Sequence, residues 1–465
     1  MRRTVYRLQL GFLSATMLAL AACAGQAPAA PTAAPAPKPA ASPAASPAAS
    51  PAASPVASPA ASPAASPAAS PAAAPAAAVA PASGPPTRIG ILTPLSAPGD
   101  ATAGQLIIRG AEFGVDFVNQ RMGGIWNAGC NLPGPIDLVK TDDAGTPEKG
   151  VAGFRKMAQD DKVVGVLGQF HSSVTLGVQP IADQLKVPFF STQSAVAEIS
   201  GNHLEYTFQT HNITTDRSEV IASFIKENAG KFKRAGVLAE NTDFVTASAQ
   251  DMEQALAGVP NMELKTWVFD RAIADQSPLL LQVKAFDPDV IYNTASGGPM
   301  YTLLKQSYDV GLLPKTTMVI GYDGPIRPEY WQNMGDKGVG IVYVSYYHPQ
   351  QPLSEAGKWM QAEYQKKYNE PALYSSFAAF GNLLTIAQAV NKACSTDGPA
   401  LVKSLETDKF MTWNSDNISF PKAEGVDWHR VKQPLLLLQY TEVNQDYGKA
   451  TILYPPNMRT GELKK

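Results

Sequence analysis

One loop of this sequence combines side chains that could bind a small anion. Its residues, Gly168-Gln-Phe-His-Ser-Ser-Val174, follow a short apolar run and precede a segment with helical periodicity. The hydroxyls of Ser172 and Ser173 would then lie where a helix begins, beside backbone N–H groups that have no partner within the helix. Such a helix start suits a carboxylate. The simpler alternative is that one of the two serines only caps the helix.

The same loop contains His171, which could in principle take part in catalysis. No carboxylate motif lies near it to orient the imidazole, so we expect it to line a pocket or to hydrogen-bond at the helix start. The sequence contains no Gly-x-Ser-x-Gly elbow, no glycine-rich nucleotide signature, and no Cys-x-x-Cys or His-Glu-x-x-His motif. Asp142 and Asp143 are expected to cap a turn. The absence of these motifs argues against an enzyme, and we expect no cofactor and no metal.

The charge balance argues against nucleic acid as a partner. The chain has 38 Lys and Arg and 40 Asp and Glu, a formal charge of −2. Residues 1–86 contain four of the basic side chains and none of the acidic ones, so residues 87–465 carry 34 against 40, or −6. A mildly acidic surface without a basic stripe does not match a nucleic acid.

The N-terminus has the features of a targeting segment. Arg2, Arg3 and Arg7 precede the short apolar run Phe12–Ala22, which lacks the ~20 residues of a spanning helix. Leu20-Ala-Ala-Cys23 resembles the lipobox of bacterial lipoproteins, which implies that Cys23 becomes the acylated N-terminus of a membrane-anchored protein. The alternative is an ordinary secretory signal with an incidental cysteine.

Residues 24–86 consist almost entirely of Ala, Pro and Ser, with Ser-Pro recurring every four residues from Ser42 to Pro71. Proline at this spacing excludes helix and sheet, so we expect an extended, semi-rigid and disordered tether. Beyond it, Cys130 and Cys394 either form a disulfide, as cysteines outside the cytoplasm often do, or remain two free thiols.

Residues 87–465 alternate between the hydrophobic periods of strands and helices. Strands are predicted in two series, at Arg88–Pro94, Ile136–Thr141, Val163–Gly168 and Val187–Ser191, and at Arg234–Ala239, Leu264–Phe269, Val290–Asn293, Met318–Gly321, Val339–Val344 and Pro434–Gln439. Helices are predicted at 105–121, 147–159, 174–185, 216–229, 245–257, 277–285, 300–310, 354–368 and 373–393. Two series of βα units predict an α/β fold with two parallel sheets flanked by helices.

Several short motifs occur in a characteristic order along this part of the chain. They are Arg88–Ser96, Gly110-Ala-Glu112, Gly123-Gly-Ile125, Asp142-Asp143 with Pro147, Val163–Ser173 and Pro188-Phe-Phe-Ser191. In order and spacing they resemble the branched-chain amino acid (Leu/Ile/Val) binding proteins, which are type I periplasmic receptors of ABC importers, and the similarity covers 87–455. The resemblance implies two Rossmann-like lobes joined by three crossover strands, near Phe208–Thr210, Tyr343–Tyr346 and 425–433.

The resemblance also implies how lobe 1 would hold a ligand. The family's serine after the third strand matches Ser172, with Phe170 and His171 beside it as pocket wall. Its Ala-x-Thr pair falls on Gln193 and Ala195, so the threonine is missing here. The neighbouring Ser194 is the expected substitute.

Lobe 2 is less similar to the family. A ligand-binding tyrosine falls on Phe244, which has no hydroxyl, and another aligns near Ser296 or Gly297. The glutamate that binds the ligand's ammonium matches Asp323. The alternative for Asp323 is that it only stabilises an Asp-Gly turn with Gly324.

These observations predict five parts of the chain. They are a lipoprotein signal peptide with lipobox (1–23), the tether (24–86), lobe 1 (87–208 plus 345–428), lobe 2 (209–344 plus 429–456) and a C-terminal tail (457–465).

The predicted function is that of a monomeric, lipid-anchored receptor outside the cytoplasm. It would capture a small polar ligand, most simply a branched-chain or other amino acid, by hinge closure and deliver it to the permease subunits of an ABC transporter. Two alternatives are a non-amino-acid ligand (urea, a short amide or a carboxylate) and a ligand sensor that is not coupled to transport.

Overall fold

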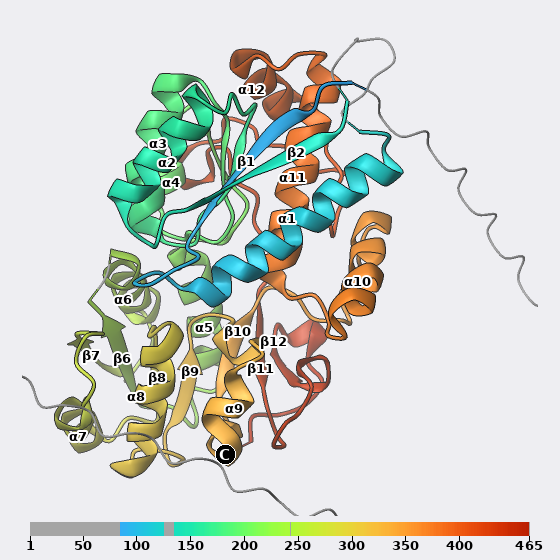
Figure 1. The fold of residues 1–465 in the computed structure, drawn as a ribbon. Helices are drawn as coiled ribbons and strands as arrows, with labels where there is room; N and C mark the ends of the chain where they lie inside the picture. Colours follow the sequence, from blue (N-terminus) through green and yellow to red (C-terminus); the bar gives the residue numbers. More distant parts are fainter. Residues whose placement is uncertain (1–83, 125–133, 242, 465) are drawn as a thin grey trace, which may run out of the picture. The chain divides into compact units, whose positions relative to one another are not determined.

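The computed structural model describes residues 84–124, 134–241 and 243–464, and it arranges their strands in two sheets (Figure 1). Sheet A has five parallel strands in the order β2-β1-β3-β4-β5. Sheet B has seven strands in the order β12-β11-β10-β9-β8-β6-β7, of which β11 pairs antiparallel with both β10 and β12. We call sheet A with its helices lobe 1 and sheet B with its helices lobe 2.

Lobe 1 is built from βα units at the start of the described chain. Its elements are β1 (Thr87–Thr93), α1 (Ala101–Arg121), β2 (Ile136–Asp142), α2 (Pro147–Gln159), β3 (Val166–Gly168), α3 (Ser172–Leu185), β4 (Phe189–Ser191), α4 (Glu198–Gly201) and β5 (Thr207–Gln209). Three later helices, α10 (Glu355–Tyr368), α11 (Tyr374–Ala393) and α12 (Gly398–Thr407), complete it. Figure 1 shows α2, α3 and α4 on one side of sheet A and α1 with α11 on the other, where these two helices pack together.

Lobe 2 continues the same alternation. It contains α5 (Thr214–Glu227), β6 (Arg234–Glu240), α6 (Asp243–Leu256), β7 (Glu263–Phe269), α7 (Ser277–Phe286), β8 (Val290–Asn293), α8 (Gly297–Asp309), β9 (Thr317–Ile320), α9 (Tyr330–Met334), β10 (Val342–Ser345), β11 (Leu436–Gln439) and β12 (Thr451–Tyr454). Successive side chains of β8 enter different cores. Tyr292 packs in the cluster that includes Met252 of α6, whereas Ile291 packs in the cluster that includes Leu304 of α8. The sheet is therefore buried on both faces, as its continuous apolar strands require.

Three segments cross between the lobes, and two of them run side by side. The first follows β5 into α5, the second follows β10 toward α10, and the third returns to β11. Gln209 forms a parallel bridge with Arg430, through hydrogen bonds of 3.0 Å to the carbonyl of His429 and 2.9 Å from the N–H of Val431. Farther along, the side chain of Asn212 bonds both backbone groups of Gln433 at 3.0 Å.

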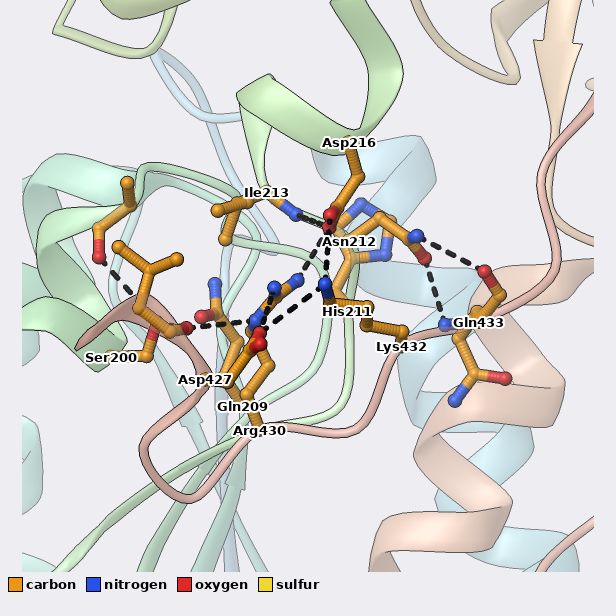
Figure 2. A network of polar contacts seen from close by, with 12 residues as sticks. Ser200, Gln209, His211, Asn212, Ile213, Asp216, Asp427, Arg430, Lys432 and Gln433 are labelled. Carbon is orange, nitrogen blue, oxygen red and sulfur yellow. Dashed lines mark hydrogen bonds and ion pairs between the residues drawn. The ribbon is translucent and has the colours of Figure 1, made fainter. Parts of the chain in front are cut away.

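A buried ion-pair network reinforces the contact between the first and third crossovers (Figure 2). The fully buried side chain of Arg430 forms ion pairs with Asp216, in the first turn of α5, and with Asp427. Lys432, which is 56% exposed, lies 3.7 Å and 3.4 Å from the same two carboxylates. Asp216 also accepts a hydrogen bond from the N–H of Ile213 at 3.0 Å. The network thus attaches the first turn of α5 to the third crossover.

The predicted α/β class with two sheets, and nearly all of the predicted elements, are confirmed to within a few residues. Two helices, 147–159 and 277–286, begin where expected, whereas β3 is shorter than predicted because residues 163–165 are not part of the ladder. The pattern did not indicate α4, α9, α12, β5 or β12. No helix within the described ranges has both the length and the hydropathy needed to cross a bilayer.

The turn after β2 agrees with the expectation for its two aspartates. Asp142 accepts hydrogen bonds from the N–H groups of Leu95 and Ala144, and Asp143 accepts one from Gly145.

Cys394 lies directly after α11 and is disulfide-bonded. Cys130 is outside the described residues, so its pairing with Cys394 stays a prediction.

Candidate functional site

A cavity of about 250 Å³ lies between the two lobes, at the carboxyl ends of their parallel strands. Lobe 1 contributes Pro98, Gly145, Phe170, His171, Ser172, Ser173 and Gln193; lobe 2 contributes Arg217, Glu240, Arg271, Ser296, Tyr322 and Asp323; and the crossovers contribute His211 and Tyr346. This is where doubly wound sheets bind ligands. The cavity is the candidate site.

The start of α3 forms the polar part of the lobe 1 wall. Ser172 is the first residue of the helix, and its Oγ accepts a hydrogen bond from the N–H of Ala195 at 3.1 Å. Ser173 follows it in the first turn, where backbone N–H groups lack partners within the helix. Together with the positive end of the helix dipole, this wall suits a carboxylate.

Two of the predicted lobe 1 residues lie behind this wall and do not line the cavity. Ser194 is fully buried, and its Oγ is 2.6 Å from the hydroxyl of Thr175 in α3. Ala195 uses its backbone N–H to hold Ser172 in place. Gln193 does line the cavity, and its buried Oε1 has no hydrogen-bond partner within the described chain.

Lobe 2 brings a second set of polar groups to the opposite wall. Glu240 ends β6, accepts a hydrogen bond from the N–H of Ser296 at 3.1 Å, and forms an ion pair with Arg271 at 3.1 Å. Burial raises the pKa of the Glu240 carboxyl, and the Arg271 guanidinium opposes this shift. Its charge is therefore already matched within the protein. Phe244, the other predicted residue of this wall, lies in α6, and its side chain is outside the described residues.

Asp323 follows β9 and is only 4% exposed. Its side chain makes no capping hydrogen bond to the short helical turn that it precedes, although the turn does form through its backbone carbonyl. Among the described ion pairs none involves Asp323. Burial raises the pKa of this carboxyl, with the Arg327 guanidinium acting in the opposite direction. Asp323 thus presents a poorly solvated carboxylate to the cavity, where a ligand cation would stabilise its charge.

An ion pair between the lobes lies beside the cavity. Arg327 of lobe 2 and Asp100, the N-cap of α1 in lobe 1, are 2.6 Å apart, with side chains 3% and 12% exposed. The guanidinium also lies 5.6 Å from the ring centroid of Phe170 and 5.5 Å from that of Tyr322, within cation–π range. Burial alone would raise the pKa of Asp100, but the charge and hydrogen bond of Arg327, together with the N–H of Ala103, outweigh it and hold that pKa below its usual value. The pair therefore links the lobes as two charges.

His171 is held at the edge of this contact. Its Nε2 accepts a hydrogen bond from the backbone N–H of Asp100 at 3.2 Å. Burial lowers the pKa of His171 to about 4 against the opposing charge of Asp100, so the ring is neutral at neutral pH. His171 thus lines the cavity, and its hydrogen bond goes to the N-cap residue of α1 and not to the start of α3, where we expected it. Within the described chain, no group of three or more potential metal ligands occurs.

Several cavity residues were not singled out from the sequence. Arg217, Glu240, Arg271 and Tyr322 line it, and Arg327 lies beside it. Glu240 ends β6 and Arg271 comes two residues after β7, and this position is a usable signal once the strands are placed. Arg217 lies within α5 and is only 2% exposed. In the sequence it looks like any surface arginine of a helix, because its burial depends on how α5 packs.

The fold and the cavity can now be compared with known proteins. The model of the periplasmic binding protein family matches residues 86–446. The chain belongs to the periplasmic binding protein family. One similar relative is the Leu/Ile/Val-binding protein homolog 7 of Brucella abortus. It is 23% identical over 331 residues, and the match covers 68% of this chain and 80% of the relative.

Two solved structures share its fold. The branched-chain amino acid transporter substrate-binding protein LivJ of Streptococcus pneumoniae, solved with isoleucine, gives a TM-score of 0.68 at 19% identity and covers 80% of this chain and 100% of that one. The second is a solute-binding protein of an ABC transporter from Rhodopseudomonas palustris, solved with 3,4-dihydroxybenzoic acid. It gives a TM-score of 0.65 at 19% identity and covers 77% of this chain and 94% of that one. The predicted type I periplasmic binding protein fold is thereby confirmed for this binding protein.

Proposed function

We propose that this periplasmic binding protein is the extracytoplasmic receptor of an ABC transporter, anchored to the membrane through an acylated Cys23. It captures a small carboxylate-bearing ligand between its lobes, most simply an amino acid, and delivers it to the permease subunits. The observation that carries the proposal is the chemistry of the cavity. It has a helix start suited to an anion on one lobe and, on the other, the carboxylate of Asp323, which makes no ion pair among the described residues.

An amino acid matches both walls at once. Its carboxylate would accept hydrogen bonds from the start of α3, around Ser172 and Ser173, while its ammonium would pair with Asp323. Because the two partners belong to different lobes, such a ligand stabilises the closed arrangement and shifts the open–closed equilibrium. The relative LivJ, solved with isoleucine, supports this ligand class.

A second ligand class has its own support. Phe170 places an aromatic ring on the wall next to Ser172, and a structural relative was solved with 3,4-dihydroxybenzoic acid. An aromatic carboxylate would use the same helix start but would leave Asp323 without a cation. A dependence of binding on Asp323 therefore separates the two classes.

The test is a thermal-shift screen of the purified full chain against amino acids, short amides, urea and aromatic carboxylates. A ligand at about 100 times its dissociation constant stabilises the folded state by about 2.7 kcal/mol, which raises the melting temperature by several degrees. Stabilisation by at least one α-amino acid is expected. The absence of any shift across the panel would contradict the proposal. Transport assays with the cognate permease would then separate a transport receptor from a sensor, which needs no transport.

A further inference from the structure

The cavity has a distinct floor where the crossovers meet. His211 of the first crossover and Tyr346 of the second both line it, with their ring centroids 4.5 Å apart. Tyr374, the first residue of α11, packs behind them at 5.4 Å and 4.6 Å. His211 is 3% exposed and the two tyrosines are fully buried. The polar atoms of these three side chains are therefore largely shielded from water, and they can form hydrogen bonds with neighbouring protein groups or with a ligand.

The hydrogen bonds around Tyr374 favour the tautomer of His211 that is protonated at Nδ1. The Tyr374 hydroxyl donates its single hydrogen to the carbonyl of Thr210 at 3.2 Å. The same oxygen lies 3.0 Å from Nδ1 of His211, and since its hydrogen is already used it can only accept there. Nδ1 must then carry the proton. In a neutral ring this leaves Nε2 as an acceptor, and within the described chain it makes no hydrogen bond.

The surroundings keep this ring neutral. Burial lowers the pKa of His211 well below its usual value, and the guanidinium groups of Arg217 and Arg430 lower it further. The neighbouring hydroxyl of Tyr346 is buried and has no hydrogen-bond partner among the described residues. An acceptor and an unused hydroxyl thus belong to two rings that line the cavity with their centroids 4.5 Å apart.

We propose that His211 determines ligand specificity, because its Nε2 accepts a hydrogen bond from a neutral donor, a hydroxyl or a carboxamide, at the hinge end of the ligand. The proposal rests on the function proposed above and adds the chemistry of the second end of the ligand. A hydroxyl or carboxamide fits best because it can donate to His211 and accept from Tyr346 at the same time. The two nearby arginines disfavour a second cation at this end. A ligand with an apolar group there would leave the acceptor buried and unpaired.

Near-isosteric pairs of ligands test this directly. Calorimetry on the purified full chain would compare threonine with valine, asparagine with leucine, and 3,4-dihydroxybenzoate with benzoate. In at least one pair, the polar member is expected to bind at least about tenfold more tightly, the difference made by one unsatisfied buried group. His211→Phe keeps a ring but removes Nε2, so the preference should disappear. The exposed His203→Phe is the matched control and should retain it.

The outcomes are distinct. Equal or tighter binding of the apolar members by the wild type, or an unchanged preference in His211→Phe, would overturn the proposal. Failure of every compound to bind would instead contradict the proposed function. In that case, or if His211→Phe does not fold, nitrogen-15 NMR of histidine-labelled wild type decides the matter. A neutral ring protonated at Nδ1 is expected at pH 7, and Tyr374→Phe should alter its signals; an Nε2–H tautomer or a charged ring would refute the inference.

Discussion

Asp323 is the single residue on which the ligand class depends most. Replacing it with Asn keeps the shape of the side chain and suits the same turn, but removes the charge that a ligand ammonium would meet. Losing the partner of a buried charge costs about 2–5 kcal/mol. The affinity for the amino acid identified by the screen should therefore fall about 30-fold to several thousand-fold, measured by calorimetry.

The control for this change is Asp309→Asn. Asp309 ends α8 in the same lobe, and its side chain is 62% exposed in a surface pair with Lys337. The Asp309→Asn variant should bind the amino acid with the affinity of the wild type. If Asp323→Asn also binds within threefold of the wild type, at an unchanged melting temperature, the carboxylate is not a ligand partner. The aromatic or neutral ligand classes would then be favoured.

At the residue scale, position after a predicted strand indicated Ser172, but Arg271, which follows β7, and Glu240, which ends β6, were not singled out. Ser172 was indicated because it follows a predicted strand and carboxyl ends of parallel strands meet at one edge. Asp323 was indicated by its match to the family's glutamate. The sequence did not indicate Arg327 or Asp100, since their contact joins positions 227 residues apart across two lobes. It also could not separate Ser172, on the wall, from Ser194 behind it. That difference depends on how α3 packs on the loop after β4.

Between the elements, the ion pair of Asp100 with Arg327 should favour closure. Asp100→Asn preserves the N-cap of α1, because Asn caps helices as well as Asp does, but leaves the Arg327 guanidinium buried without its counter-charge. Removing one partner of a buried ion pair is strongly destabilising. Because this pair joins the two lobes, its loss should destabilise the closed arrangement. Calorimetry should show at least about a tenfold loss of affinity, about 1.4 kcal/mol.

A double variant shows whether the charge is responsible. Arg327→Met combined with Asp100→Asn removes both charges, and replacing a buried pair by apolar groups is often neutral. The double variant should therefore bind more tightly than Asp100→Asn alone. If it binds no better, Arg327 contributes through its stacking on Phe170 and Tyr322 and not through the ion pair.

The hinge network offers an element-scale test of stability. The side chain of Arg430 is fully buried between Asp216 and Asp427, whereas Lys432, which contacts the same carboxylates, is 56% exposed. Arg430→Met should lower the free energy of unfolding by about 3–5 kcal/mol. Lys432→Met, the matched control, should lower it by no more than about 1 kcal/mol. Denaturant unfolding measures both, and equal small losses would mean that the network does not hold the crossovers together.

The same scale shows what sequence periodicity can predict. Fully buried apolar runs such as that of β8 predicted strands close to their observed bounds, because both faces of sheet B are buried. The pattern did not indicate α12, or β12, which pairs only at the edge of its sheet and buries only its two central residues. Their positions follow from tertiary packing.

For the whole molecule, the first question is attachment to the membrane. If Cys23 is acylated, as the lipobox resemblance predicts, Cys23→Ser should move the protein from the membrane fraction to the soluble fraction. Two acyl chains suffice for stable anchoring, and without them the predicted tether and acidic lobes have little affinity for lipid. Fractionation with immunodetection measures this. Unchanged membrane association of the variant would remove the lipoprotein prediction.

The second question is whether the ligand closes the lobes. The cavity has walls on both, so a ligand that contacts Ser172 on one side and Asp323 on the other binds the closed arrangement more tightly than the open one. Small-angle X-ray scattering of the full chain should therefore show a smaller radius of gyration at saturating ligand than without it. The tether predicted at 24–86 contributes equally to both samples, so the difference reports on the lobes. Asp100→Asn without ligand should be at least as extended as the wild type, because it lacks the ion pair that joins the lobes. If saturating ligand leaves the scattering of the wild type unchanged, and Asp100→Asn scatters identically, the receptor is closed before it binds, and its affinity does not depend on hinge motion.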